Sequence, residues 1–178
     1  VLPGVVASLN ASVELIDADP AEGFHFPYLL SLPERPGMDG PAVLIVETNN
    51  TGTEDDFGVT LAATRDSVGS YGLGPMLSRH MKQPLLMPVF PRTKSEGLVY
   101  THALDRDSME IAEGPLERLD LQLLAMVRDA QKRITQGGVQ VKERFVMIGF
   151  SASGTFSNRF AFLHPETLFA VVSGGVNA

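Results

Sequence analysis

The chain has 178 residues, of which 44% are hydrophobic and 20% are charged, and its formal net charge is −7 at pH 7. This acidic balance argues against a nucleic-acid partner or an anionic membrane surface, because either would select a basic face. The sequence has no cysteine, which excludes disulfides, thiol catalysis and cysteine-ligated metal but indicates no compartment. The length suits one domain, and no apolar run reaches the length of a membrane span.

The amino-terminal half predicts mainly strands. Residues 12–18 ("SVELIDA") and 24–33 ("FHFPYLLSLP") are predicted strands, separated by the turn-like "DPAEG". Residues 41–48 ("PAVLIVET") form a continuous β-branched run, typical of a strand buried on both faces, which leads into the polar loop "NNTGTEDDFG". A helix is predicted over 74–82, with a proline near its start, and a second buried strand over 84–91.

The carboxyl-terminal half alternates helices and strands. The apolar spacing predicts a long helix over 115–134, with Pro115 in its first turn and two glycines after its end. A buried strand over 144–150, a helix over 154–164 and another buried strand over 168–175 follow. Two early strands followed by this alternation predict an α/β fold of three layers (α/β/α), with a mostly parallel sheet and helices on both faces.

The junction "GFSASG" lies where a predicted strand ends and a helix begins, and ligands gather beyond the carboxyl ends of parallel strands. Ser151 has Gly149 two residues before it and Ser153 two residues after it, followed by Gly154, which gives G-x-S-x-S-G rather than G-x-S-x-G. A tight turn of this kind lifts the serine hydroxyl above the sheet. The N–H of Ala152 and the start of the helix then favour a developing oxyanion in the same space.

Other interpretations of this junction stay open at the level of sequence. A Gly-Ser turn can simply cap a helix. A helix N-terminus also attracts phosphate, but neither glycine-rich phosphate motif is present here and no lysine follows. Ser153 is the alternative nucleophile, although it would place Ser151 and Thr155 at the two flanking positions where glycine is wanted. Ser151 is therefore the favoured nucleophile.

The chain resembles an α/β-hydrolase over nearly its whole length. The two early strands resemble the opening antiparallel pair of that family, "PAVLIVETNNTG" its third strand and oxyanion loop, and "PLLMPVFPRT" the strand after its first helix. "FVMIGFSASGTFSNRFAFLHPETLFAVVSGG" resembles the nucleophile strand, the elbow, the following helix and the next strand. Among the members, the elbow and the segments before it are most similar to esterases and polyester depolymerases.

The resemblance implies that Ser151 is the nucleophile and that the Ala152 N–H is one donor of the oxyanion hole. Many members have a His-Gly pair in the loop that supplies the second donor, where this chain has "NNTG". A backbone N–H of Asn50 or Thr51 can still serve there, because the side chain is not the donor. Asn49 or Asn50 can also contribute a side-chain amide.

The activity that the resemblance implies is hydrolysis of a carboxylic ester, in preference to an amide, through an acyl-enzyme. The substrate would be a small-molecule or polymer ester, and no cofactor or metal is called for. Asn49 and Phe150 are the predicted substrate-binding residues. A rival interpretation is a non-catalytic hydrolase-fold module that binds or scaffolds, because fold alone does not confer activity.

The order in the family is serine, then acid, then histidine, whereas this chain ends just after the strand that follows the elbow helix. His25 falls in a strand, His80 on a helix and His164 at a helix end, whereas His102 falls in a loop but precedes the serine. We therefore expect residues 1–178 to be the amino-terminal portion of a single α/β-hydrolase domain. The rest of the gene or a second chain would complete the triad.

Two further features have alternative interpretations. The acidic run "EDD" at 54–56 could bind a cation, although contiguous carboxylates in a loop are usually a solvated face. Phe57, Tyr71 and Tyr100 fall in or near loops above the predicted sheet. They could line an apolar substrate pocket or pack against neighbouring loops.

Overall fold

The computed structural model describes residues 12–34, 36, 40–70, 72–96 and 104–176. The strands are β1 (Ser12–Ile16), β2 (Tyr28–Leu32), β3 (Ile45–Glu47), β4 (Leu85–Pro88), β5 (Phe145–Phe150) and β6 (Leu168–Gly174). The helices are α1 (Phe57–Gly69), α2 (Leu73–Met81), α3 (Arg106–Met109), α4 (Leu119–Gln136) and α5 (Ala152–Leu163), followed by a short 3-10 turn, η1 (Pro165–Thr167).

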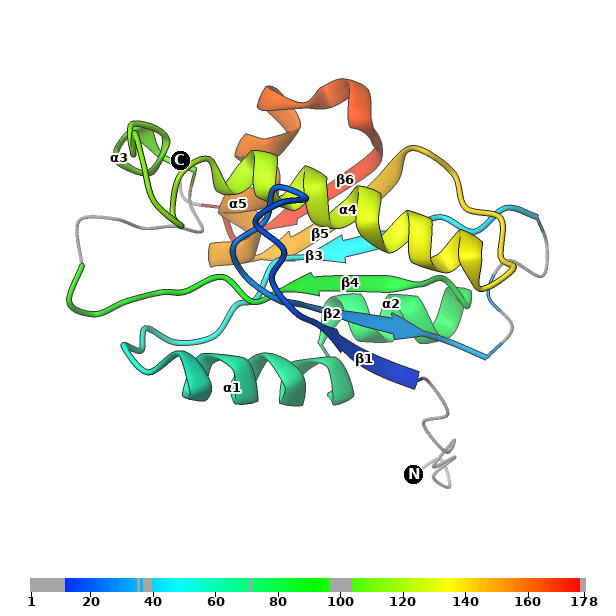
Figure 1. The fold of residues 1–178 in the computed structure, drawn as a ribbon. Helices are drawn as coiled ribbons and strands as arrows, with labels where there is room; N and C mark the ends of the chain where they lie inside the picture. The colour runs from blue at the N-terminus through cyan, green and yellow to red at the C-terminus, as the bar shows by residue number, and fades with distance from the viewer. Residues whose placement is uncertain (1–11, 35, 37–39, 71, 97–103, 177–178) are drawn as a thin grey trace.

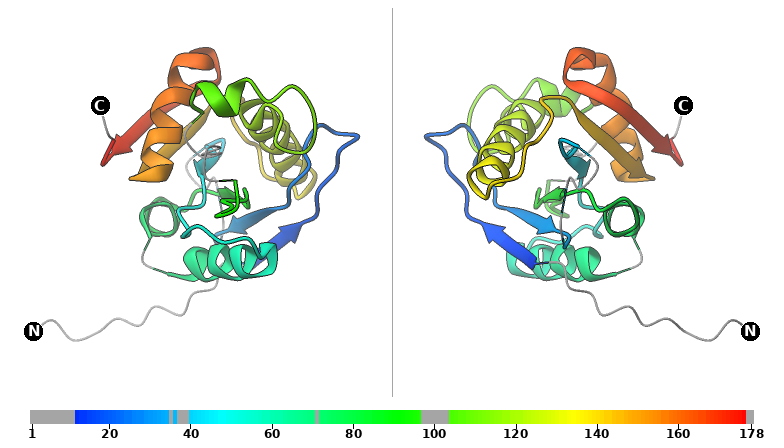
Figure 2. Two further views of the ribbon diagram at one scale, coloured as in Figure 1. Left: turned by 90° about the vertical axis from the view of Figure 1, so that its left-hand side faces the viewer. Right: turned by 90° about the vertical axis from the view of Figure 1, so that its right-hand side faces the viewer.

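The strands form one mixed sheet in the order β1-β2-β4-β3-β5-β6. Strand β2 is antiparallel to both β1 and β4, whereas the β4–β3, β3–β5 and β5–β6 pairs are parallel. Helices α1 and α2 cover one face, and α4 and α5 cover the other (Figure 1). The views along the strands in Figure 2 show the same three layers. The predicted three-layer α/β/α fold is confirmed.

The larger hydrophobic core lies between the sheet and helices α4 and α5. Aromatic rings form its centre, with Phe156 stacked between Phe90 and Phe160 at centroid distances of 6.0 and 6.2 Å. Helix α4 contributes the apolar stripe that the sequence predicts, buried at Leu119, Leu123, Met126, Val127, Ala130 and Ile134. Smaller clusters lie on the α1 and α2 face. Burial on both faces explains why β3, β4 and β5 are apolar throughout most of their lengths.

Helix α4 begins four residues later than its sequence predicts, so the prediction that Pro115 lies in its first turn is wrong. Arg118 has a φ of +45°, which a right-handed helix excludes, and its guanidinium donates to both carboxylate oxygens of Asp120 at 2.9 and 2.7 Å. This bidentate pair fixes the turn before the helix. The two glycines at 137–138 end the helix, as predicted.

Helix α1 has no counterpart among the sequence predictions. Its buried positions are Thr60, Thr64 and Val68, so the face toward the sheet is made largely of threonine rather than of aliphatic residues. The Thr64 hydroxyl donates to the carbonyl of Thr60 at 2.8 Å, which satisfies this polar group inside the helix. Periodicity of hydrophobic residues therefore does not reveal the helix.

Candidate active site

The turn between β5 and α5 (residues 149–154, hereafter the Ser151 turn) has a strained backbone at its tip. Ser151 has φ +58° and ψ −120°, a conformation that costs a non-glycine residue about 1–3 kcal/mol. Its N–H donates to the Gly174 carbonyl at 2.9 Å, and helix α5 starts at the next residue. The turn therefore presents an exposed serine at the carboxyl end of β5 and at the N-terminus of a helix.

Two glycines make this turn sterically possible. A Cβ atom on Gly149 would lie 2.3 Å from the carbonyl oxygen of Ser153, and one on Gly154 would lie 2.2 Å from the carbonyl oxygen of Gly174. Both distances are far below van der Waals contact with backbone atoms that cannot rotate away. The glycines are therefore needed for the close packing of α5 against β5 and β6.

Ser153 occupies the position where glycine would complete the usual motif, and its side chain is 1% exposed. Its hydroxyl accepts from the Phe150 N–H and donates to the Phe150 carbonyl, both at 3.0 Å. The Ser153 hydroxyl is thus bound to the end of β5. The Ser151 side chain makes no capping hydrogen bond to α5 within the described residues, so the structure gives no support to the helix-cap interpretation.

The loop from β3 to α1 (residues 48–56, hereafter the β3–α1 loop) begins beside the Ser151 turn, because β3 and β5 are neighbouring parallel strands. The Asn50 Nδ2 donates to the Phe150 carbonyl at 3.0 Å, so it bridges the two segments. Asn49 is buried, and its amide donates to the Phe90 carbonyl at 2.9 Å and accepts from the Phe90 N–H at 3.0 Å. The Asn49 side chain therefore joins the ends of β3 and β4.

The residues predicted as oxyanion donors lie in these two segments. Ala152 is the first residue of α5, where backbone N–H groups have no partner within the helix. Asn50 is exposed, whereas Thr51 is buried with its hydroxyl 3.2 Å from the amide of Asn49. The structure thus gathers the predicted donors and Ser151 at the carboxyl ends of two adjacent strands.

Phe150 is 59% exposed although it belongs to a central strand. Its ring lies over the end of β6, where a Cβ on Gly174 would be 2.9 Å from one ring carbon and a Cβ on Gly175 would be 3.1 Å from another. The two glycines therefore make room for an aromatic ring next to Ser151. Of the other aromatic residues considered, Phe57 contacts Phe26 at a centroid distance of 6.1 Å, whereas Tyr71 and Tyr100 lie outside the described residues.

Two of the four histidines, His80 and His164, lie where the sequence predicts. His80 lies on α2 and is exposed, His25 precedes rather than enters β2, and His102 lies outside the described residues. His164 follows α5, and its Nε2 lies 2.8 Å from the Oδ2 of Asp120. A helix of twelve residues, about 18 Å long, separates His164 from Ser151.

The buried Asp120 carboxylate lies between His164 and Arg118. Burial alone would raise the pKa of Asp120, but the hydrogen bonds from Arg118 and His164 outweigh it and hold the pKa below its ordinary value. The hydrogen bond between Asp120 and His164 joins the start of α4 to the end of α5. It therefore anchors the far end of α5, the helix that directly follows Ser151.

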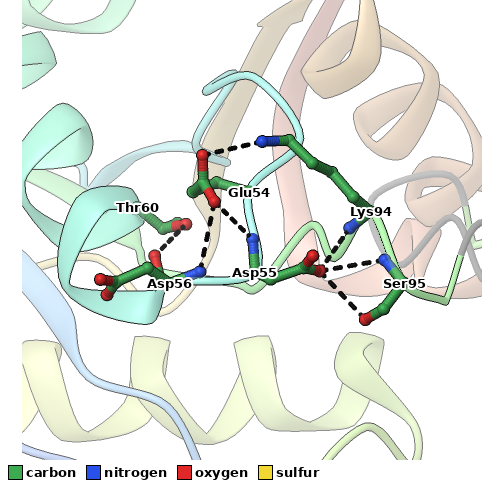
Figure 3. Close-up of polar contacts among 6 residues, drawn as sticks. All are labelled: Glu54, Asp55, Asp56, Thr60, Lys94 and Ser95. Atoms are coloured by element: carbon green, nitrogen blue, oxygen red, sulfur yellow. Dashed lines mark hydrogen bonds and ion pairs between the residues drawn. The ribbon is translucent and has the colours of Figure 1, made fainter.

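The acidic run at 54–56 is engaged in local contacts. Glu54 pairs with Lys94, and Asp55 accepts from the backbone and side chain of Ser95 (Figure 3). The Asp56 side chain caps α1 by accepting from the Gly58 N–H at 2.7 Å. Within the described residues, no group of three or more His, Cys, Asp or Glu side chains is placed to hold a metal ion. Among the helices of the described residues, none is long and apolar enough to cross a membrane.

The fold and this arrangement define the chain as α/β-hydrolase-like in structure. The chain matches no protein-family model and no curated protein sequence. Its architecture is similar to that of solved hydrolase structures. Poly(aspartic acid) hydrolase-1 from Sphingomonas sp. KT-1 aligns with a TM-score of 0.56 at 15% identity, over 92% of this chain and 55% of the other.

Two further solved structures have the same architecture. The acetyl xylan esterase from Aspergillus awamori aligns with a TM-score of 0.56 at 14% identity, over 92% of this chain and 52% of the esterase. A poly(3-hydroxybutyrate) depolymerase from Bordetella parapertussis aligns with a TM-score of 0.53 at 17% identity, over 92% of this chain and 50% of the depolymerase. The chain thus spans about half the length of the solved structures that it matches, and at these identities the likeness establishes the fold.

Proposed function

We propose that the chain belongs to a serine hydrolase that cleaves a carboxylic ester, in preference to an amide, through an acyl-enzyme on Ser151. The observation that carries the proposal is the strained backbone of an exposed Ser151 at a strand-to-helix turn. In this role the turn is a nucleophile elbow, which aims the hydroxyl above the sheet. The esterase and depolymerase neighbours support a small-molecule or polymer ester as the substrate.

In this mechanism Ser151 attacks the ester carbonyl and its proton passes to a histidine base. The tetrahedral oxyanion accepts hydrogen bonds from the Ala152 N–H and from a backbone N–H of Asn50 or Thr51. The intermediate then expels the alcohol, which takes the proton from the histidine, and an acyl-enzyme remains. Water, deprotonated by the same base, releases the acid and restores the serine. Phe150 is exposed next to Ser151, where it would contact the substrate.

The acid and the histidine of the triad come, in this proposal, from a further part of the hydrolase domain, encoded by the same gene or by a second chain. Strand β6 pairs with β5 alone among the described residues, and Phe169, Val171 and Val172 on it are exposed. An open strand edge with exposed apolar side chains needs a cover. The intact mass of the purified sample and a search for a second polypeptide test this. A monodisperse, stable monomer of 19.2 kDa would contradict it.

A fluorophosphonate probe tests the nucleophile. The probe reacts with activated serines, so the complete, folded polypeptide that contains this chain should be labelled at Ser151 and should lose esterase activity in proportion. Peptide mapping locates the adduct. Labelling at another residue, or no labelling of the folded protein, would contradict the proposal.

A non-catalytic hydrolase-fold module is the second candidate function. Ser153 in place of glycine and the Asn49-Asn50 pair in place of His-Gly favour it. The coding sequence beyond residue 178 discriminates between the two. A histidine in a loop after the last strand, preceded by an Asp or Glu in an earlier loop, favours the enzyme, and the lack of both favours the module.

A further inference from the structure

The β3–α1 loop is held from outside by the segment that follows β4. Glu54 forms an antiparallel bridge with Arg92, in which the Glu54 N–H donates to the Arg92 carbonyl at 2.7 Å. The Arg92 guanidinium in turn donates through Nη1 to the carbonyl of Thr51. One arginine therefore contacts the loop at two points, through its backbone and through its side chain.

Glu54 and Asp55 extend this attachment along the loop through their side chains (Figure 3). The Lys94 ammonium lies 2.9 Å from Oε2 of Glu54. One Asp55 carboxylate oxygen accepts from the Lys94 N–H at 2.8 Å and from the N–H and hydroxyl of Ser95, both at 3.0 Å. The Lys94 hydrogen bond holds the pKa of Glu54 below its ordinary value, so this pair stays charged at neutral pH.

These contacts differ in expected strength. The Lys94–Glu54 pair is largely exposed, and surface ion pairs contribute little because water screens them. The hydrogen bond from Arg92 to Thr51 is partly buried and carries a charged donor, which makes it stronger than a neutral surface contact. Arg92 is therefore the residue on which the attachment should depend most.

The hydrogen bond to the Thr51 carbonyl affects the orientation of the peptide plane between Thr51 and Gly52. A trans peptide unit directs its carbonyl and the following N–H to opposite sides. A donor on the Thr51 carbonyl therefore fixes the plane between Thr51 and Gly52, directly after the predicted oxyanion donors. On the other side of those donors, the Asn50 amide fixes the loop to the Phe150 carbonyl.

We propose that Arg92 is a positioning residue for the oxyanion hole. It holds the β3–α1 loop so that a backbone N–H of Asn50 or Thr51 faces the carbonyl attacked by Ser151. This inference rests on the proposed function, and it adds a role for a residue outside both predicted oxyanion segments. An oxyanion donor acts mainly in the transition state, so loss of the attachment should lower kcat and leave KM unchanged.

The test compares variants of the complete polypeptide that contains this chain. Arg92→Met removes the guanidinium and keeps an unbranched side chain, whereas Arg92→Lys keeps a charged donor. Arg106→Met is the matched control, because Arg106 is 86% exposed and pairs only with Glu110 among the described contacts. The measurements are kcat and KM for a p-nitrophenyl ester, fluorophosphonate labelling of Ser151, and hydrogen exchange of amides in the β3–α1 loop.

The expected result for Arg92→Met is a kcat about 10–100-fold lower at unchanged KM, because a misplacement of about 1 Å costs about 100-fold. Amide exchange should become faster in the β3–α1 loop and should not change in α4. Arg92→Lys should recover part of both losses, and Arg106→Met should match the parent protein. If Arg92→Met does not fold, the test rests on Arg92→Lys. A partial loss of kcat together with faster amide exchange in the β3–α1 loop would then support the inference, and no change in either would contradict it.

Two failures are distinguishable. In the first, the parent protein is labelled at Ser151 and hydrolyses the ester, while Arg92→Met keeps full kcat and unchanged amide exchange in the β3–α1 loop. This result overturns the role of Arg92 and leaves the hydrolase proposal intact. A folded parent protein with no labelling and no hydrolysis overturns the hydrolase proposal and, with it, the positioning role. A rise in KM at constant kcat would also overturn the inference.

Discussion

The Ser151 turn and the β3–α1 loop lie at the carboxyl ends of adjacent parallel strands, yet they are held in opposite ways. The turn is fixed by close steric contacts of its glycines, because a Cβ on Gly149 would meet the Ser153 carbonyl at 2.3 Å and one on Gly154 would meet the Gly174 carbonyl at 2.2 Å. The loop is fixed by polar contacts to distant segments. Its partners Phe90 and Arg92 are 41 residues away along the chain from the loop residues they contact, and Phe150 is 100 residues away.

This difference shows how the two halves of a candidate site tolerate sequence change. Steric constraints allow only glycine at certain positions, so the turn keeps a short pattern that is visible in the sequence. Polar constraints require a donor or an acceptor at the right place, which several residue types can supply. The β3–α1 loop accordingly has "NNTG" where many α/β-hydrolases have a His-Gly pair.

The largest expected effect is loss of the nucleophile at the tip of the turn. Ser151→Ala should lower kcat by about 10⁶-fold, because triad residues act as a unit. Steady-state hydrolysis of a p-nitrophenyl ester measures it. A Ser151→Ala protein with substantial remaining activity would show that Ser151 is not the nucleophile.

Gly154→Ala tests the steric half of the comparison. The added Cβ would lie 2.2 Å from the Gly174 carbonyl oxygen, so the free energy of unfolding should fall by about 3 kcal/mol as α5 is forced away from β6. Urea denaturation provides the measurement. Gly69→Ala is the control, because among the described residues its added Cβ would meet no atom within 4 Å apart from its chain neighbours and the backbone of its own helix. Equal free energies of unfolding for Gly154→Ala and Gly69→Ala would contradict the conclusion that steric contact holds the Ser151 turn.

Ser153→Ala separates hydrogen bonding from shape within the turn. The substitution removes both hydrogen bonds between the Ser153 hydroxyl and the backbone of Phe150, which should lower the free energy of unfolding by about 2 kcal/mol. Ser151 should still react with a fluorophosphonate. Loss of labelling in a folded Ser153→Ala protein would instead indicate that Ser153 is the reactive residue.

Asn50→Ala tests the contact that joins the loop to the turn. Loss of the Nδ2 hydrogen bond to the Phe150 carbonyl should lower kcat about fivefold, because about 1 kcal/mol of positioning is lost. Stability should change little, since the side chain is exposed. Kinetics and urea denaturation together measure both effects. A large loss of stability at constant kcat would make Asn50 a structural residue only.

Glu47 lies in β3, directly before the loop, and gives the smallest expected effect. Burial raises its pKa above the ordinary value of 4.5, and the Gly74 N–H at 2.8 Å opposes that shift. A raised pKa in the folded state means that the stability contributed by Glu47 is complete below pH 4.5 and is lost as pH rises through the folded pKa.

Glu47→Gln removes this titration and keeps an acceptor for the Gly74 N–H. The stability of the variant relative to the parent protein should therefore be greater at neutral pH than at pH 4.5. Urea denaturation at the two pH values measures the difference. A relative stability that does not depend on pH would contradict the expectation.

Much of the sheet was predictable from the sequence. Apolar runs identify β4 and β5, and the stripe from Leu119 to Ile134 identifies α4, because burial demands a regular hydrophobic pattern. The run over 168–175 also identifies β6, but the prediction that this strand is buried is wrong, because residues 169–172 are exposed. Two features were not predictable. Helix α1 buries threonines rather than aliphatic residues, and the start of α4 depends on the left-handed backbone of Arg118 and its pairing with Asp120.

The candidate site divides in the same way. The preference for Ser151 over Ser153 as the nucleophile stays a prediction, and the structure buries the Ser153 hydroxyl against the backbone of Phe150. Nothing in the sequence indicates that the Asn49 amide pairs with the backbone of Phe90, that Asn50 reaches Phe150 or that Arg92 reaches Thr51. Each of these contacts joins segments that only the pairing of the strands brings together.

The sequence by itself determined the layered α/β architecture and the position of Ser151 at a strand-to-helix turn, because burial patterns and the steric need for Gly149 act over a few residues. The tertiary structure alone decided which groups hold the β3–α1 loop beside that serine. Hydrogen bonds between distant residues form only after β3, β4 and β5 have paired, and their partners leave no local pattern in the chain.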